Sequence, residues 1–250
     1  MSKSAADAKV ADFWDYESKD WGDKYGRRSS YFYRRRTFHE YFQSTGVVRG
    51  DILDYGCGAG DITFPMLRAG HAVTGVDIAE GMARKAAERA AQAGLSERAS
   101  YSHLSAPVME QVAARKFDVV VCSSVLEYVE DDEKLLRTFY EILVDGGHLL
   151  VSVPDRSSLF CRMDKWMHRN QRLLKGFVPV GKLAYIDIQQ RQYDIGQFVR
   201  RLEAMGFVLE QKRYNTITLQ RGVIMEKISN IPGIGMLALM MFRKADRASR

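Results

Sequence analysis

The sequence predicts an α/β fold built on a doubly wound, mostly parallel sheet of seven strands. Short apolar runs alternate with amphipathic stretches of helical period, and this alternation is typical of βαβ units. One run, FDVVVC at residues 117–122, is apolar almost throughout, as in a central parallel strand covered on both faces. Glycines close the predicted helices, for example Gly70 and Gly94. We therefore expect crossover connections that place helices on both faces of the sheet.

The expected elements follow the chain in this alternation. The predicted strands are residues 51–55, 72–76, 99–103, 117–122, 148–153, 207–214 and 236–242. The predicted helices are residues 62–69, 81–93, 132–143 and 195–204. The second of these helices is rich in alanine, and Gly206 closes the last one.

Two segments do not fit this alternation. Residues 1–46 have a helical, aromatic-rich pattern and are expected to form an N-terminal cap. Residues 47–250 are expected to form the main domain, in which residues 155–194 carry no clear strand and are rich in Arg, Lys, Trp and Met. This insert follows the fifth strand, at the carboxyl edge of the sheet where ligands bind. Because long irregular segments in compact domains are usually functional, we expect cap and insert to form a lid.

The composition is that of an ordinary globular protein, with 250 residues, 46% of them hydrophobic and 27% charged. Three cysteines, Cys57, Cys122 and Cys161, are too scattered for a disulfide framework or a zinc site, which favours a reducing compartment and no metal. The first residues lack the apolar core of a signal peptide. The most apolar stretch, residues 231–242, is too short to span a bilayer. A cytoplasmic location is therefore expected.

The most informative motif is ILDYGCGAGD at residues 52–61, where the first strand turns into the first helix. Gly56, Gly58 and Gly60 let the backbone turn tightly and approach a ligand closely. Their G-x-G-x-G spacing differs from the G-x-G-x-x-G loop that binds a dinucleotide pyrophosphate. Asp54, just before the glycines, would repel a pyrophosphate and suits a ligand with a cationic amino group.

Asp77 ends the second predicted strand, seventeen residues after Gly60. An acidic residue at this place can accept hydrogen bonds from both hydroxyls of a ribose. Together with the glycine loop, it predicts a ligand that combines a ribose with a cationic amino group.

On these residues the chain resembles the class I S-adenosylmethionine-dependent methyltransferases, in particular the group of quinone-biosynthesis and natural-product enzymes. The matching stretches are LDYGCGAG at 53–60, VTGVDIAEGM at 73–82, FDVVVCSSVLEYVED at 117–131 and LVDGGHLLVSVP at 143–154. The resemblance implies a Rossmann-like fold, S-adenosyl-L-methionine as the methyl donor and S-adenosyl-L-homocysteine as the product.

The resemblance also implies where the donor binds. Asp54 would lie near the methionine amino group, Asp77 would hold the ribose, and Ser123 and Ser124 would line the cleft near the sulfonium. The loop LSAP at 104–107 departs from the family, because it offers no acidic residue to the adenine amine. The implied cofactor-binding residues are Tyr25, Asp54, Gly56, Cys57, Gly58, Gly60, Asp77, Ile78, Met82, Ser105, Ser123 and Ser124.

The catalytic residues are less defined, because methyl transfer needs alignment and exclusion of water more than a base. The candidates are Glu127, Tyr128, His168 and His39. Relatives commonly carry a histidine where this chain has Tyr128, which removes one candidate base. We expect Glu127 to bond backbone groups and His39 to lie on the surface. For His168 in the insert two interpretations stay open, one in which it faces the substrate and one in which it does not.

The expected acceptor is a small molecule, methylated at a hydroxyl on an apolar or aromatic framework that carries an acidic group, because the insert is both basic and aromatic. An amine acceptor is the alternative. Nucleic acid is not favoured, because residues 123–126 read SSVL and lack the Asn/Asp-Pro-Pro-aromatic motif of base methyltransferases. The net charge of +6 and the basic stretches 24–36 and 156–182 also suit a peripheral membrane enzyme acting on a lipid or prenylated quinone, or a solvated basic face. The sequence does not indicate the oligomeric state.

Overall fold

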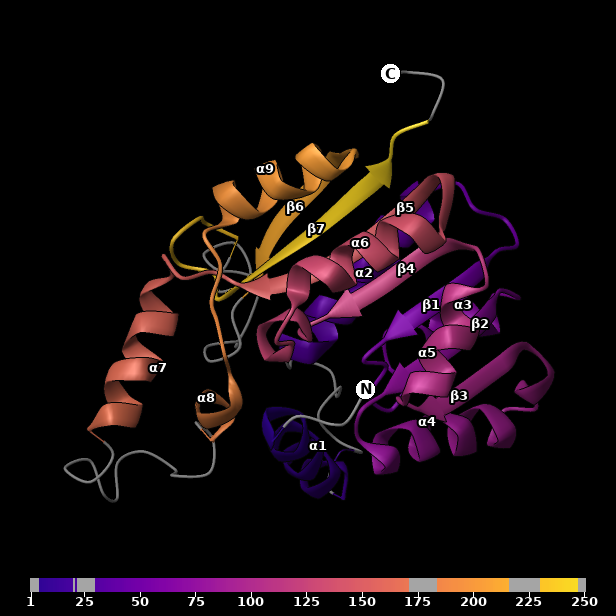
Figure 1. Ribbon diagram of the computed structural model, residues 1–250, viewed down its shortest axis with the longest axis horizontal. Coiled ribbons are helices and arrows are strands. Elements are labelled where there is room, and N and C mark those ends of the chain that lie inside the picture. Colours follow the sequence, from indigo (N-terminus) through magenta and orange to yellow (C-terminus); the bar gives the residue numbers. More distant parts are fainter. Residues whose placement is uncertain (1–4, 20, 22–29, 171–183, 216–229, 247–250) are drawn as a thin grey trace.

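The computed structural model describes residues 5–19, 21, 30–170, 184–215 and 230–246. Its centre is a seven-stranded sheet with the order β3-β2-β1-β4-β5-β7-β6 (Figure 1). The strands are β1 Asp51–Tyr55, β2 Ala72–Asp77, β3 Ala99–His103, β4 Phe117–Ser123, β5 Leu143–Pro154, β6 Phe207–Asn215 and β7 Leu237–Lys244. Strands β1 to β5 pair in parallel, whereas β7 runs antiparallel to both β5 and β6. The predicted doubly wound, mostly parallel sheet of seven strands is confirmed.

Helices cover both faces of this sheet. The described helices are α1 Ala5–Ser18, α2 Ser30–Ser44, α3 Phe64–Arg68, α4 Glu80–Gln92, α5 Ala106–Ala113, α6 Asp132–Ile142, α7 Leu159–Arg169, α8 Tyr185–Ile188 and α9 Ile195–Met205. One face packs against α5, α6 and α9, and the other packs against α2, α3 and α4. Within the described residues, no helix combines the length and apolar character needed to cross a membrane.

The central strand shows why the fold is wound on both faces. In β4, Val120 and Cys122 belong to the core under α6, while Val119 and Val121 belong to the core under α2. All four are fully buried, since successive strand residues point to opposite faces. The apolar run at 117–122 is therefore a central parallel strand covered on both faces, as the sequence predicted.

Three parts of the fold differ from the sequence expectation. Helix α5, between β3 and β4, was not expected; Pro107 occupies its first turn, where a missing amide proton costs nothing. The insert contains α7 and the single turn α8, joined to the sheet by an isolated bridge between Asp155 and Tyr193. Helix α2 also packs into the core, where Phe38 and Tyr41 are fully buried.

The end of the insert is bonded to the turn that follows β4, a 3₁₀ segment, η3, at Leu126–Tyr128. Gln190 donates its amide to the carbonyl of Glu127 at 2.9 Å. The Tyr193 hydroxyl lies 2.9 Å from the Leu126 carbonyl and 2.9 Å from a carboxylate oxygen of Asp132. These bonds, of which the two from the Tyr193 hydroxyl are buried, hold the insert against the carboxyl edge of the sheet.

Replacing Tyr193 with Phe tests this connection. The change keeps the ring but removes one buried donor that the Leu126 carbonyl and the Asp132 carboxylate share, so we expect the free energy of unfolding to fall by about 1–2 kcal/mol. Urea denaturation measures the change. Tyr140→Phe is the matched control, since its ring packs on Phe207 and its hydroxyl makes no hydrogen bond within the described residues. An equal loss in both variants would contradict the assignment.

Candidate functional site

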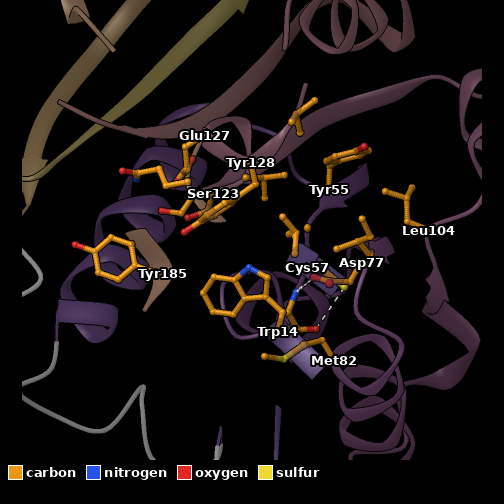
Figure 2. A pocket seen from close by; sticks show the side chains of 18 of the residues that line it. Trp14, Tyr55, Cys57, Asp77, Met82, Leu104, Ser123, Glu127, Tyr128 and Tyr185 are labelled. Atoms are coloured by element: carbon orange, nitrogen blue, oxygen red, sulfur yellow. Dashed lines mark hydrogen bonds between the residues drawn. The ribbon is translucent and has the colours of Figure 1, made fainter. Parts of the chain in front are cut away.

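A cavity of about 1560 Å³ opens at the carboxyl ends of β1, β2, β4 and β5 (Figure 2). It is walled by the glycine loop, α1, the turn after β4, and the insert helices α7 and α8. Of the residues singled out from the sequence, the cavity wall contains Gly56, Cys57, Gly58, Asp77, Ile78, Met82, Ser105, Ser123, Ser124, Glu127 and Tyr128. Asp54, Gly60, His39 and His168 are not on the wall. Tyr25 lies outside the described residues.

The three glycines of the loop all have positive φ, but each serves a different contact. A Cβ on Gly56 would lie 2.1 Å from Val125 Cγ2. The backbone of the glycine loop therefore packs directly against the Val125 side chain of the turn after β4. A Cβ on Gly60 would contact Tyr101 and Ala86. A Cβ on Gly58 would meet no protein atom within 4 Å, and Gly58 lines the cavity. Only Gly58 therefore exposes bare backbone to a ligand.

Asp77 lies at the cavity wall with its carboxylate held by the backbone. Its Oδ2 accepts the Gly58 amide at 2.8 Å, and its Oδ1 accepts the Ala79 amide at 2.9 Å. Burial raises the pKa of Asp77 to about 6, although the two amides lower it. The carboxylate is thus fixed in orientation before any ligand binds.

Asp54 lies beneath the loop rather than in the cavity. Its side chain is buried, and Oδ2 accepts the Thr63 hydroxyl at 2.6 Å. Burial raises the pKa of Asp54 to about 7, against the lowering effect of the Thr63 bond. Asp54 therefore reaches the cavity only through its charge and through the loop above it.

Aromatic side chains of the opening segment cover this half of the cavity. Trp14 packs edge-on against Trp21 and against Tyr128, with ring centroids 5.9 and 6.0 Å apart. The Trp21 indole donates to Asp61 at 2.9 Å, which fixes it beside the glycine loop. The sequence showed an aromatic opening segment but not which rings face the cavity. Val10, Trp14 and Trp21 all line it, and the available signal was the four-residue spacing of Val10 and Trp14, which places both on one face of α1.

The turn after β4 carries the polar groups of the other half. Ser124 has a φ of +55°, a left-handed conformation that is uncommon outside glycine. Its Oγ accepts a hydrogen bond from Arg34 at 2.8 Å, and the Arg34 guanidinium lies over the Tyr31 ring. Arg34 was not singled out in the sequence, because only tertiary packing brings α2 beside β4.

The insert supplies the far wall through α7 and α8. Cys161, Asp164 and Met167 of α7 line the cavity, and Tyr185 of α8 donates its hydroxyl to Asp164 at 3.0 Å. His168 lies on another side of α7, where its ring bonds Asp187 at 2.9 Å.

The basic residues of the described insert do not line the cavity. Arg156 pairs with Asp194 at 2.9 Å, and Arg162, Lys165 and Arg169 are exposed. These side chains give no support to an acidic group on the acceptor. No group of three or more His, Cys, Asp and Glu side chains among the described residues is arranged to hold a metal.

Comparisons with known proteins agree with this geometry. The chain matches a family model described as a methyltransferase domain over residues 25–212. It is 30% identical over 119 residues to a ubiquinone biosynthesis O-methyltransferase from Psychrobacter arcticus, covering 48% of this chain and 46% of that protein. The chain thus spans about half the length of the curated relatives it matches.

Two solved structures share the whole fold at low identity. Magnesium protoporphyrin IX methyltransferase from Synechocystis, with bound SAH, has a TM-score of 0.66 and 16% identity, covering 95% of this chain and 99% of that one. The N-methyltransferase NodS from Bradyrhizobium japonicum, also with SAH, has a TM-score of 0.61 and 16% identity over 94% and 98% of the two chains. The family model matches most of this chain, and the glycine loop and Asp77 lie at the cavity. This chain therefore belongs to the methyltransferase-domain family.

Proposed function

We propose that this protein transfers a methyl group from S-adenosyl-L-methionine to a small-molecule acceptor and releases S-adenosyl-L-homocysteine. The observation that carries the proposal is the pairing of Gly58 and Asp77 on the cavity wall. Gly58 presents open backbone, and Asp77 presents a carboxylate already held by two amides. The relatives named above act as methyltransferases, and two structural neighbours hold SAH.

The cavity residues fit the donor part by part. Asp77 accepts the ribose hydroxyls, and Ile78, Met82 and Leu104 provide apolar walls for the adenine, with Ser105 beside them. The glycine loop takes the methionine portion. The Asp54 carboxylate beneath the loop favours the ammonium group through its charge.

The electrostatics of the cavity also support a cationic donor. Although the chain carries a net charge of +6, acidic side chains outnumber basic ones on the described wall. The acidic ones are Asp7, Glu17, Asp61, Asp77, Glu110, Glu127, Glu130, Asp131 and Asp164, and the basic ones are Arg34 and Lys134. A sulfonium with an ammonium group offsets part of this negative charge.

The rest of the cavity is assigned to the acceptor. Its volume exceeds the roughly 300–1,000 Å³ of a typical single-ligand pocket, so two molecules fit side by side. Aromatic and apolar side chains such as Tyr31, Met167, Tyr185 and Met236 form its walls. We assign it a mainly apolar acceptor methylated at a hydroxyl, with an amine as the alternative. The lid of opening segment and insert excludes water and aligns the two molecules.

A second proposal concerns where this enzyme works, and the outer face of α7 supports it. Leu159, Met163 and Trp166 lie one helical turn apart and are exposed, Trp166 by 59%. Beside this stripe run the exposed Arg162, Lys165 and Arg169. An apolar stripe flanked by cations suits the surface of an anionic bilayer. We propose that α7 docks the protein there, from which an apolar acceptor reaches the cavity.

Replacing Asp77 with Ala tests the donor site. The change removes the two ribose hydrogen bonds and the groups that orient the Gly58 amide. At about 1–1.5 kcal/mol for each ribose bond, the affinity for S-adenosyl-L-methionine should fall tenfold or more. Titration calorimetry measures this affinity. The control is Asp51→Ala, at an exposed position that begins β1, away from the carboxyl edge of the sheet. Equal affinities in parent and Asp77→Ala would reject the role of Asp77.

Replacing Gly58 with Val should abolish donor binding, because the side chain enters open cavity space that the ligand occupies. Gly70→Val is the matched control: Gly70 also has positive φ, at +105°, and open space around it, but lies away from the cavity. Both variants carry backbone strain, so both should lose stability. Calorimetry with S-adenosyl-L-homocysteine should show binding only to Gly70→Val; binding to both would refute the assignment of the loop.

The membrane proposal predicts cosedimentation with vesicles of phosphatidylglycerol and phosphatidylcholine, and much less with phosphatidylcholine alone. Leu159→Ala combined with Trp166→Ala removes most of the apolar stripe and should lower the bound fraction at least fivefold. Val48→Ala, at another exposed apolar position, is the control. Binding that ignores anionic lipid, or that survives the double change, would count against docking through α7.

A further inference from the structure

Glu127 is a buried carboxyl group on the cavity wall with one oxygen unpaired. Its side chain is 2% exposed, and Oε2 has no hydrogen-bond partner among the described residues. A buried polar atom without a partner is costly, and native structures keep few of them. Such an atom in a ligand cavity points to a partner that arrives with the ligand.

Its position places Glu127 beside the donor half of the cavity. Val125 packs against Gly56 of the glycine loop, and Glu127 follows two residues later. Figure 2 shows Glu127 close to Ser123 and Tyr128, whereas Cys57 and Asp77 lie together in another part of the cavity beside Trp14. The end of the insert fixes its backbone, because the Gln190 amide bonds the Glu127 carbonyl at 2.9 Å. The backbone that carries this carboxyl group is therefore held in place before an acceptor binds.

Four other titratable residues, Asp164, Tyr128, His39 and His168, are less suited to receive a proton from the acceptor. Asp164 also has an unpaired oxygen, but it lies on the lid helix α7 and holds the Tyr185 hydroxyl. Burial raises the pKa of Tyr128 well above its usual value, so its phenol stays protonated. His39 and His168 are not on the wall.

The charges around Glu127 set the pH at which it ionises. Burial raises the pKa of Glu127 to about 8, although the positive charge of Arg34 from α2 lowers it. Cys122 of β4, Tyr128 of the same turn and Tyr193 at the end of the insert also interact with it. Burial raises the pKa values of these three groups as well, so they stay neutral while Glu127 titrates.

We propose that Glu127 is a catalytic residue that binds the acceptor hydroxyl and takes its proton during methyl transfer. The O–H bond breaks and the proton passes to Glu127 Oε2. The acceptor oxygen bonds the methyl carbon as the carbon–sulfur bond breaks, and that electron pair stays on sulfur. The proton then leaves to solvent, so a cationic sulfonium becomes a neutral thioether and one proton. This inference rests on the proposed function and names its acceptor as a hydroxyl that is protonated at neutral pH.

The test uses the full chain saturated with S-adenosyl-L-homocysteine, and a matched pair of probes. 4-Propylphenol carries the hydroxyl, and 4-propylanisole is its methyl ether. Saturation-transfer NMR should show the phenol binding about fivefold or more tightly than the ether, as one hydrogen bond provides. That preference should increase as pH rises through about 8, when the carboxylate forms, and Glu127→Leu should abolish it. Glu133→Gln, an exposed change outside the cavity, should behave as the parent.

Rates of methyl transfer to 4-propylphenol give the second measurement. The parent rate should rise as pH passes through about 8, whereas Glu127→Gln should lose 10²–10⁴-fold in rate and the pH response, with partial rescue by Glu127→Asp. 4-Propylaniline in parallel distinguishes amine from hydroxyl transfer, and a preference for the amine would overturn the hydroxyl assignment. Equal binding of phenol and ether, including binding of neither, would overturn the proposal.

Folding and donor binding separate this proposal from its alternatives. Glu127→Gln should keep its Tm and its affinity for S-adenosyl-L-homocysteine within the range of the parent. If the Tm and the affinity of Glu127→Gln both fall, Glu127 is a structural residue and the proposal fails. If the parent itself does not bind S-adenosyl-L-homocysteine, the proposed function fails, whatever the phenol preference of Glu127.

Discussion

The site depends on the close approach of two loops at the carboxyl edge of the sheet. Gly56 and Val125 meet at a distance that leaves no room for a side chain on the glycine. Because β1 and β4 are parallel neighbours, their loops leave the sheet at the same edge, and this contact joins them. It places Gly58 and Asp77 on one side of a single cavity and Ser124 and Glu127 on the other. The proposed donor and acceptor sites therefore rest on one packing constraint.

The second theme is the burial of carboxyl groups around this contact. Asp54, Asp77 and Glu127 are each less than a tenth exposed, and burial raises the pKa of each. Ionised carboxylates are costly when they are buried without a counter-charge, and a cation beside them favours their ionised forms. Under the proposed function, the donor brings that positive charge, so binding and ionisation support each other. The site is prepared for a cationic ligand at the expense of stability without it.

The third theme is the cover formed by two segments far apart in sequence. Trp14 from the opening helix contacts Tyr128 of the turn after β4, while Tyr185 and Asp164 of the insert form the far wall. Helix α1 also contacts α4 and α8, so it links the donor side to the insert (Figure 1). The outward face of α7 is apolar and basic, and its inward face carries the cavity residues. One helix thus separates the proposed membrane contact from the acceptor pocket.

The sequence by itself determined the sheet, its winding and the donor motif, because these depend on local periodicity and on glycine conformations. The apolar run of β4, the loop at Gly56–Gly60 and the strand end at Asp77 are all features of neighbouring residues. Tertiary structure alone decided that Asp54 lies under the loop, bonded to Thr63, and that Arg34 reaches Ser124. It also turned Arg162 and Arg169 outward and left one carboxyl oxygen of Glu127, Oε2, without a hydrogen-bond partner among the described residues. Charge sums and residue order do not reveal such arrangements, because burial and hydrogen-bond partners arise only when distant segments pack together.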